Sequence, residues 1–230
     1  MEYLELNNDV KMPVEGLGTF LLSPADAEAA SLVALEAGYE HIDTANAYMN
    51  EKAVGRAIAK SGIARDKIFV STKLWPSVYE AGDAAVDATL ARLGLDYVDM
   101  LILHQPVGNY LAAWKTMERA YKAGKVKALG LSNFPQDKIA EVIDAAEIKP
   151  QLVTVECHPY FTQEELRAYL KPYGIVIEAW SRCSQSWPRS TARPRLRSSY
   201  AGTPRWASPS SPAPRTPITS RTTPPSLISA

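Results

Sequence analysis

The sequence predicts an α/β protein built as a (β/α)8 barrel of the TIM type, truncated after about its seventh strand. Short apolar runs alternate with segments of helical period, which is the pattern of βαβ units around a parallel sheet. Several runs are nearly continuous in Val, Ile and Leu, as in Val98–Leu103, and this suits strands buried on both faces. Gly16 and Gly18 lie inside the first strand with no G-x-G-x-x-G turn after it, so a barrel fits better than a doubly wound sheet.

A hairpin and then seven strands are expected in order along the chain. Residues 1–12 read as a small β-hairpin with its turn at Asn7, Asn8 and Asp9, placed to cap the barrel floor. Apolar runs of strand length follow, and helical segments join them. The seven strands are expected at residues 14–21, 41–45, 67–74, 97–104, 126–132, 152–157 and 175–180.

Six helices should lie between these strands, and the pattern gives limits for five of them. Gly38, Gly94 and Gly124 each follow a helical segment, and glycine is the usual residue just past a helix end. Thr162 and Glu165 have the spacing of a capping box at the start of the last helix. The five helices are expected at residues 24–37, 84–93, 111–123, 135–146 and 162–170.

Charge divides the chain into a body, residues 1–181, and a tail, residues 182–230. The chain has 25 basic and 25 acidic residues, but the tail holds eight Arg and no acidic residue, which leaves the body acidic. An acidic body argues against nucleic acid as a partner. The chain starts without a signal-peptide pattern and has no apolar run of membrane-spanning length. Cys157 and Cys183 imply no disulfide framework, so we expect a cytoplasmic protein without a membrane partner.

Polar side chains stand where successive apolar runs end, which in a barrel is the side that carries the chemistry. Asp43, Lys73 and His104 occupy three such strand ends, and Tyr48 follows closely after the first. A Lys ammonium lowers the pKa of a nearby Tyr by stabilising the phenolate, and a carboxylate keeps that Lys charged. A neutral His can orient a carbonyl. This set suits protonation of a carbonyl oxygen while hydride from a bound nicotinamide reaches the carbon.

Five sequence blocks in register resemble the aldo-keto reductases, and the resemblance covers residues 1–181. They are G-Y-E-H-I-D-T-A-N-A-Y at 38–48, S-T-K-L-W at 71–75, L-I-L-H-Q-P at 101–106, G-K-V-K-A-L-G-L-S-N-F at 124–134 and V-E-C-H-P-Y at 155–160.

The resemblance implies NADPH-dependent reduction of small aldehydes and ketones, with residue roles that carry over by position. The family's catalytic tetrad falls on Asp43, Tyr48, Lys73 and His104, with Tyr48 as general acid. No metal ligand set is implied. The remaining matches are Ser132 and Asn133 for the nicotinamide carboxamide, Trp180 for the ring that stacks on the nicotinamide, and Trp75, together with His104, for substrate binding.

The sequence differs from the family pattern at one point, and several of the matching residues also have simpler structural interpretations. Val153 and Thr154 replace the Asn-Gln that the family usually has there, and Thr has a shorter reach than Gln. Taken singly, each tetrad residue could be an ordinary cap, packing or loop residue. Glu156, Cys157 and His158 are read as structural and are not placed in the site.

The tail allows three readings. Its eight Arg, nine Pro, eleven Ser and six Thr fit a disordered segment, and the same composition fits an RNA-binding or phosphorylated linker. We favour a frameshift near Ser181, because residues 199–223 allow a displaced reading that resembles the family's eighth strand and phosphate loop. A chain made as written should then have two unpaired barrel edges, weak NADPH binding and little turnover. The alternatives are therefore a catalytically dead remnant or an Arg-rich nucleic-acid-binding protein.

Overall fold

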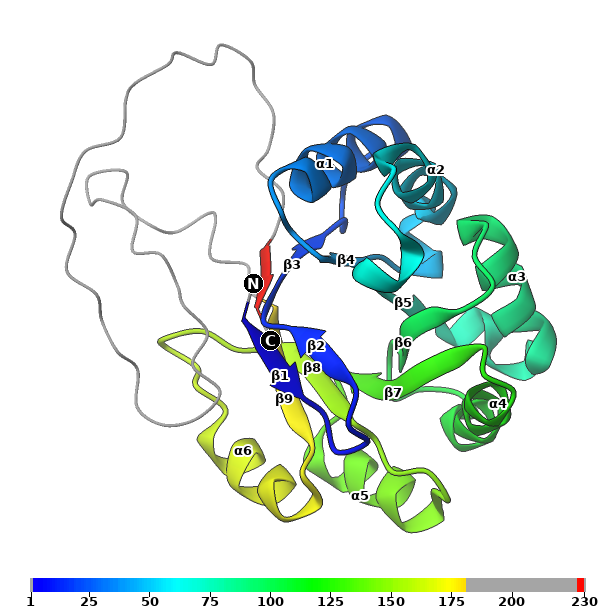
Figure 1. Ribbon diagram of the computed structural model, residues 1–230. Coiled ribbons are helices and arrows are strands. Elements are labelled where there is room, and N and C mark those ends of the chain that lie inside the picture. Colours follow the sequence, from blue (N-terminus) through cyan, green and yellow to red (C-terminus); the bar gives the residue numbers. More distant parts are fainter. Residues whose placement is uncertain (1, 181–226, 230) are drawn as a thin grey trace, which may run out of the picture.

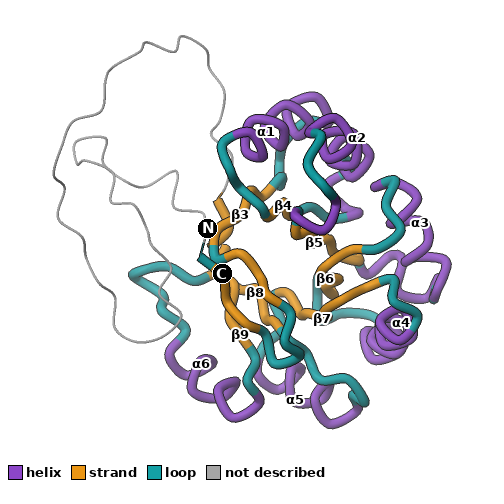
Figure 2. Tube along the Cα trace, viewed as in Figure 1, coloured by secondary structure: helices purple, strands orange, loops and turns teal. Residues whose placement is uncertain are grey.

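The computed structural model describes residues 2–180 and 227–229 (Figure 1). Seven parallel strands stand side by side in chain order, as expected, and helices surround them on the outside (Figure 2). The strands are β3 (Glu15–Gly18), β4 (His41–Asp43), β5 (Phe69–Leu74), β6 (Val98–Leu103), β7 (Val126–Ser132), β8 (Leu152–Glu156) and β9 (Val176–Trp180).

Six α-helices occupy the connections within the described ranges. One of them, α2, had no predicted limits. None of these helices is long and apolar enough to cross a membrane. The α-helices are α1 (Pro24–Glu36), α2 (Glu51–Ser61), α3 (Asp83–Leu93), α4 (Tyr110–Lys122), α5 (Gln136–Ala145) and α6 (Glu164–Leu170); the short 3-10 helices are η1 (Asn46–Tyr48), η2 (Arg65–Lys67), η3 (Pro76–Ala81) and η4 (Lys171–Tyr173).

Helix ends follow local chemistry, with one correction to the sequence prediction. Gly94 ends α3 in the left-handed conformation, as glycine allows. The capping box expected at Thr162 and Glu165 is wrong, because Gln163 is the N-cap of α6 and its side chain makes no capping hydrogen bond. The backbone oxygen of Thr162 instead accepts a hydrogen bond from Arg167 Nε at 2.9 Å.

The N-terminal hairpin closes one end of the barrel, as predicted. Strands β1 (Tyr3–Glu5) and β2 (Lys11–Pro13) pair antiparallel and lie across that end in Figure 1. Asn7 Nδ2 donates hydrogen bonds to the backbone oxygens of Pro150 and Tyr173, at 3.0 and 3.1 Å. Two buried hairpin side chains join the inward side chains of the strands in one apolar cluster, made of Leu6, Met12, Phe69, Met100, Ile102, Ala128 and Leu152.

A short tenth strand occupies the gap between the first and last parallel strands. β10 (Leu227–Ser229) pairs antiparallel with β3 over three residues and with β9 through Ser229 and Ala179. The expectation of two unpaired edges is therefore wrong, because any extended segment can satisfy the backbone groups of an open edge. The remaining predictions for the tail, residues 182–226 and 230, lie outside the described residues.

Candidate active site

A buried ion pair joins the ends of two neighbouring strands. Lys73 Nζ, at the end of β5, donates to both carboxylate oxygens of Asp43, at the end of β4, and to the backbone oxygen of Thr44 at 3.1 Å. The two side chains are 4% and 2% exposed. Burial, the largest single effect, lowers the pKa of Lys73, but Asp43, Tyr48 and Glu178 together outweigh it, and the pKa lies above its ordinary value. Lys73 therefore keeps its charge.

Two further buried residues, Ser71 and His41, form a hydrogen-bonded chain that ends on Asp43. Ser71 Oγ donates to Asp43 Oδ1 at 2.7 Å, and His41 Nε2 lies 2.9 Å from Ser71 Oγ. Burial, aided by the charge of Lys73, lowers the pKa of His41 to about 3, so this ring is neutral. Both residues lie within the sequence blocks that match the family, at 38–48 and 71–75, but the sequence analysis assigned them no role. Their signal is the two-residue spacing from Asp43 and Lys73, which puts them on the same strand face.

Tyr48 lies on η1, beside the ammonium of Lys73. The Nζ atom is 5.2 Å from the centre of the Tyr48 ring. Burial raises the pKa of Tyr48 and Lys73 lowers it in part, so the net pKa is above its ordinary value. Lys73 acts in the expected direction, but burial is the larger effect. Tyr48 is therefore protonated at neutral pH.

Two aromatic rings, Phe20 and His104, pack against Tyr48, and a third ring packs against His104. The His104 ring, just past β6, is 5.7 Å from the Tyr48 ring, and the Trp75 ring meets His104 edge-on at 4.8 Å. Phe20 packs against Tyr48 at 5.1 Å. Burial, with a contribution from Lys73, lowers the pKa of His104 to about 3, so His104 is neutral as expected. All four tetrad candidates and Trp75 therefore meet in one place; Phe20 was not predicted.

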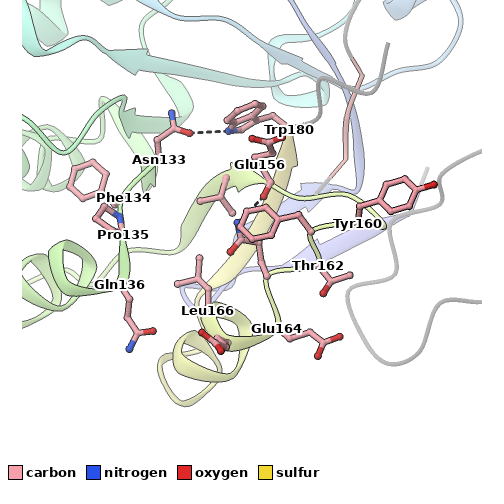
Figure 3. Close-up of a pocket in the computed structure, with 14 residues that line it drawn as sticks. Asn133, Phe134, Pro135, Gln136, Glu156, Tyr160, Thr162, Glu164, Leu166 and Trp180 are labelled. Atoms are coloured by element: carbon pink, nitrogen blue, oxygen red, sulfur yellow. Dashed lines mark hydrogen bonds between the residues drawn. The ribbon is translucent and has the colours of Figure 1, made fainter. Parts of the chain in front are cut away.

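The three predicted cofactor residues also come together, at the ends of β7 and β9. Trp180 Nε1 donates to Asn133 Oδ1 at 3.1 Å (Figure 3). Asn133 Nδ2 donates to Ser132 Oγ at 3.1 Å, and Asn133 has a left-handed backbone with φ 62°. An open cavity of about 730 Å³ borders Asn133 and Trp180 and extends to α6 (Figure 3). This site can hold a flat, amide-bearing ring beside the indole.

Thr154 and Glu178 form a buried pair that sequence reasoning missed. Thr154 Oγ1 donates to Glu178 Oε2 at 2.6 Å, and Glu178 is 0% exposed. Burial, together with the charge of Asp43, raises the pKa of Glu178 to about 7. The signal was a single acidic residue in the apolar run 175–180, where a charged side chain needs a reason to be buried.

Of the three residues interpreted as structural, Glu156 lines the cavity, and Cys157 and His158 follow it directly in the chain. His158 Nε2 is 3.3 Å from Glu156 Oε1, and Cys157 Sγ is 3.4 Å from an Arg167 nitrogen. Within the described residues, no group of three or more His, Cys, Asp and Glu side chains could hold a metal ion.

The fold and site define an α/β barrel with a buried polar cluster at the C-terminal ends of its strands, where barrel enzymes carry out their chemistry. The sequence profile of the Aldo/keto reductase family matches residues 16–202. The chain therefore belongs to the aldo/keto reductase family of NAD(P)H-dependent oxidoreductases, and the resemblance seen in its sequence blocks is confirmed.

Curated relatives and solved structures agree with this assignment. Glyoxal reductase of Bacillus subtilis is 42% identical over 79% of this chain, and morphine 6-dehydrogenase of Pseudomonas putida is 43% identical over 77%. The chain spans 67% and 62% of their lengths. An aldo/keto reductase of Brucella melitensis superposes with a TM-score of 0.76, at 40% identity over 78% of this chain and 72% of that one. A Bombyx mori aldo-keto reductase in complex with NADP has a TM-score of 0.73, at 32% identity over 77% of this chain and 65% of that one.

Proposed function

We propose that this chain carries the site of a carbonyl reductase that converts small aldehydes or ketones to alcohols with NADPH. The observation that supports it best is the contact of Lys73 with Tyr48 while Asp43 holds the same ammonium in a buried ion pair. Such an arrangement stabilises the phenolate and so offsets part of the rise in the pKa of Tyr48 that burial causes. The names of two relatives, glyoxal reductase and morphine 6-dehydrogenase, point to different substrates, so we propose only a class of substrate, small carbonyl compounds.

Each side chain has a separate task in this proposal. Tyr48, protonated at neutral pH, donates its proton to the carbonyl oxygen. Lys73 stabilises the phenolate that forms, and Asp43 keeps Lys73 charged and in place. His104 is neutral and its ring lies against Tyr48, so it can direct the carbonyl oxygen toward Tyr48 by a hydrogen bond. Trp75 and Phe20 supply apolar walls for the rest of the substrate.

Three residues would hold the nicotinamide cofactor. Asn133 and Ser132 offer amide and hydroxyl groups for the carboxamide, and the half-buried Trp180 offers an aromatic face. The hydroxyl hydrogen of Thr154 is committed to Glu178, so this residue can only accept a hydrogen bond from the carboxamide. When bound, the cofactor supplies the hydride that no side chain can provide.

The proposed function is tested by carbonyl-dependent oxidation of NADPH, with glyoxal and an aromatic aldehyde as substrates. We expect the Tyr48→Phe variant to lose about 10²–10⁴-fold in kcat, because it removes the general acid. Tyr173→Phe, at an exposed ring far along the chain, is the matched control. Equal rates in the original chain and in Tyr48→Phe would contradict the role of Tyr48.

Binding of NADPH is measured separately, by quenching of tryptophan fluorescence. The weak binding and low turnover expected from the sequence stay predictions, as does the remnant reading. If NADPH binds weakly or not at all and neither carbonyl substrate stimulates its oxidation, the remnant hypothesis is supported, whereas tight saturable binding would contradict the weak binding that we expect. Salt-dependent RNA binding without NADPH binding would favour the third alternative, a nucleic-acid-binding protein.

A further inference from the structure

Glu178 is a buried carboxyl group that the proposed reaction does not use. It lies on β9 directly opposite Thr154 of β8. Along β9, Val176 packs with the barrel-floor cluster and Ile177 with the outer core, so alternation places Glu178 on the interior face with Val176. Its Oε2 accepts one hydrogen bond, from Thr154. Its Oε1 is buried and has no partner among the described residues.

The charged groups that face Glu178 come from two other strands. Asp43 of β4 and Lys73 of β5 both interact with Glu178 electrostatically, and a charge on Glu178 raises the pKa of Tyr48 of η1. Thr154 of β8 is neutral. The ammonium of Lys73 is already taken up by Asp43, with which it forms the ion pair. An ionised Glu178 would therefore be a second carboxylate beside Lys73, whose ammonium is already paired with Asp43 and compensates Glu178 only in part.

Hydrogen bonding decides which carboxyl group carries a proton. Asp43 receives donors from Lys73 on both oxygens and from Ser71, all of which favour its ionised form. Glu178 receives one donor and leaves Oε1 bare. A buried charge without partners is strongly disfavoured. The proton therefore belongs on Glu178.

We propose that Glu178 is a neutral carboxylic acid in the folded enzyme below neutral pH, and that in this form it is a positioning residue that leaves the effect of Lys73 on Tyr48 undiminished. The pKa of Glu178, raised to about 7 by burial, agrees with the geometry. When Glu178 loses its proton to solvent, its negative charge raises the pKa of Tyr48 and makes Tyr48 a weaker acid. The catalytic consequence rests on the proposed function; the protonation itself does not.

Infrared spectroscopy of the whole chain tests the protonation without any need for activity. Below the pKa of about 7 we expect the carbonyl stretch of a neutral carboxylic acid, which disappears well above it. Glu178→Gln should remove this band. Glu156→Gln, at a carboxyl group 42% exposed on the neighbouring strand, should keep it and is the matched control. Absence of the band in the original chain, or its persistence in Glu178→Gln, would overturn the proposal.

A second variant covers the case in which Glu178→Gln does not fold. Thr154→Val removes the hydrogen bond to Oε2 while nearly keeping the shape of the side chain. The band should remain, shift in frequency, and titrate at a higher pH, because the ionised form loses its donor. A band unchanged in both position and midpoint would show that it does not come from Glu178.

The pH profile of carbonyl reduction tests the consequence. The rate of the original chain should fall on the basic side, with the same midpoint as the infrared band. Glu178→Gln should lose this decline, and Glu156→Gln should keep it. Reductase activity without the band would overturn the inference and leave the proposed function standing. The band without any reductase activity would confirm the protonated Glu178 while contradicting the proposed function.

Discussion

Lys73 Nζ contacts both carboxylate oxygens of Asp43 in a place where water reaches almost none of either side chain. Bringing two charges out of water is costly, and replacing both by apolar groups of similar size is often neutral or favourable. The pair is therefore poor evidence for stability and better evidence for a function that needs a fixed positive charge. Its position, at the strand ends beside Tyr48, supports that reading.

Breaking this pair on one side should be expensive. We expect Lys73→Met to lower the free energy of unfolding by about 3–5 kcal/mol, because it leaves Asp43 buried without its cation. Urea denaturation followed by circular dichroism measures the loss. Lys122→Met, which breaks an exposed pair with Glu147, is the control and should cost about 0–1 kcal/mol.

The double variant Asp43→Asn with Lys73→Met separates charge from packing. It removes both charges, so most of the stability lost in Lys73→Met should return, while reductase activity should not. A double variant as unstable as the single one would show that packing around the Lys73 side chain, rather than the unpaired carboxylate, sets the cost.

Two neutral histidines should make the fold sensitive to acid. The pKa values of His41 and His104 are about 3 in the folded chain against 6.5 when unfolded, so the unfolded chain binds more protons between these values. The free energy of unfolding should thus fall as pH drops from 6.5 toward 3, by up to ~1.4 kcal/mol per pH unit for each histidine. Above pH 6.5 these two groups contribute no dependence.

Comparison of variants isolates the histidine contribution from that of the carboxyl groups. In His104→Gln the slope of unfolding free energy against pH, measured by urea titration, should be smaller than in the original chain. Glu178 acts in the opposite sense: its raised pKa makes the fold lose stability as pH rises from 4.5 through about 7. Glu178→Gln should therefore remove a loss of stability between pH 4.5 and about 7. Parallel curves for all three proteins would contradict both assignments.

Local patterns were enough to predict the barrel strands and the polar ends of several of them. The run 126–132 coincides with β7, and Asp43, Lys73 and His104 stand where the strand-end argument puts them. Their meeting could be inferred because neighbouring parallel strands bring their carboxyl ends to one side of a barrel. Such reasoning needs the order of the strands and no side-chain detail.

Contacts between distant segments were beyond such patterns. The hydrogen bond from Thr154 to Glu178 depends on which residues of β8 and β9 face each other. The sequence of a short apolar run does not determine this strand register. The capping box failed because backbone geometry at Gln163, rather than the spacing from Thr162 to Glu165, begins α6. Pairing of β10 with β3 joins the two ends of the described chain, which no local signal can predict.

Trp75 should govern substrate affinity more than stability. Its side chain is 38% exposed and meets His104 through one ring edge. We expect Trp75→Ala to raise KM for an aromatic aldehyde by up to about tenfold, because an aromatic contact is worth about 0.5–1.5 kcal/mol. Steady-state kinetics with glyoxal, which is too small to need this wall, is the internal comparison. An equal rise in KM for both substrates would argue against a wall role.

A side chain at Gly55 should destabilise the fold because of a close contact, and not because of a positive φ angle. It lies in α2, and a Cβ atom there would be 2.0 Å from the backbone oxygen of Leu93, the last residue of α3. A backbone oxygen at a helix end cannot move aside as a flexible side chain can. We expect Gly55→Ala to cost about 1–3 kcal/mol of unfolding free energy, despite the better helix propensity of Ala.

Gly62, just past the same helix, provides the matched comparison. A Cβ there would meet nothing within 4 Å, but the residue has φ +69°. Gly62→Ala should therefore cost about 1–2 kcal/mol through backbone strain alone, and Gly62→Asn should cost less, because Asn visits this conformation more readily. Gly55→Asn should be at least as damaging as Gly55→Ala, since its larger side chain meets the same oxygen. Urea denaturation of the four variants measures these differences, and a milder Gly55→Asn would show that α2 can move away from α3.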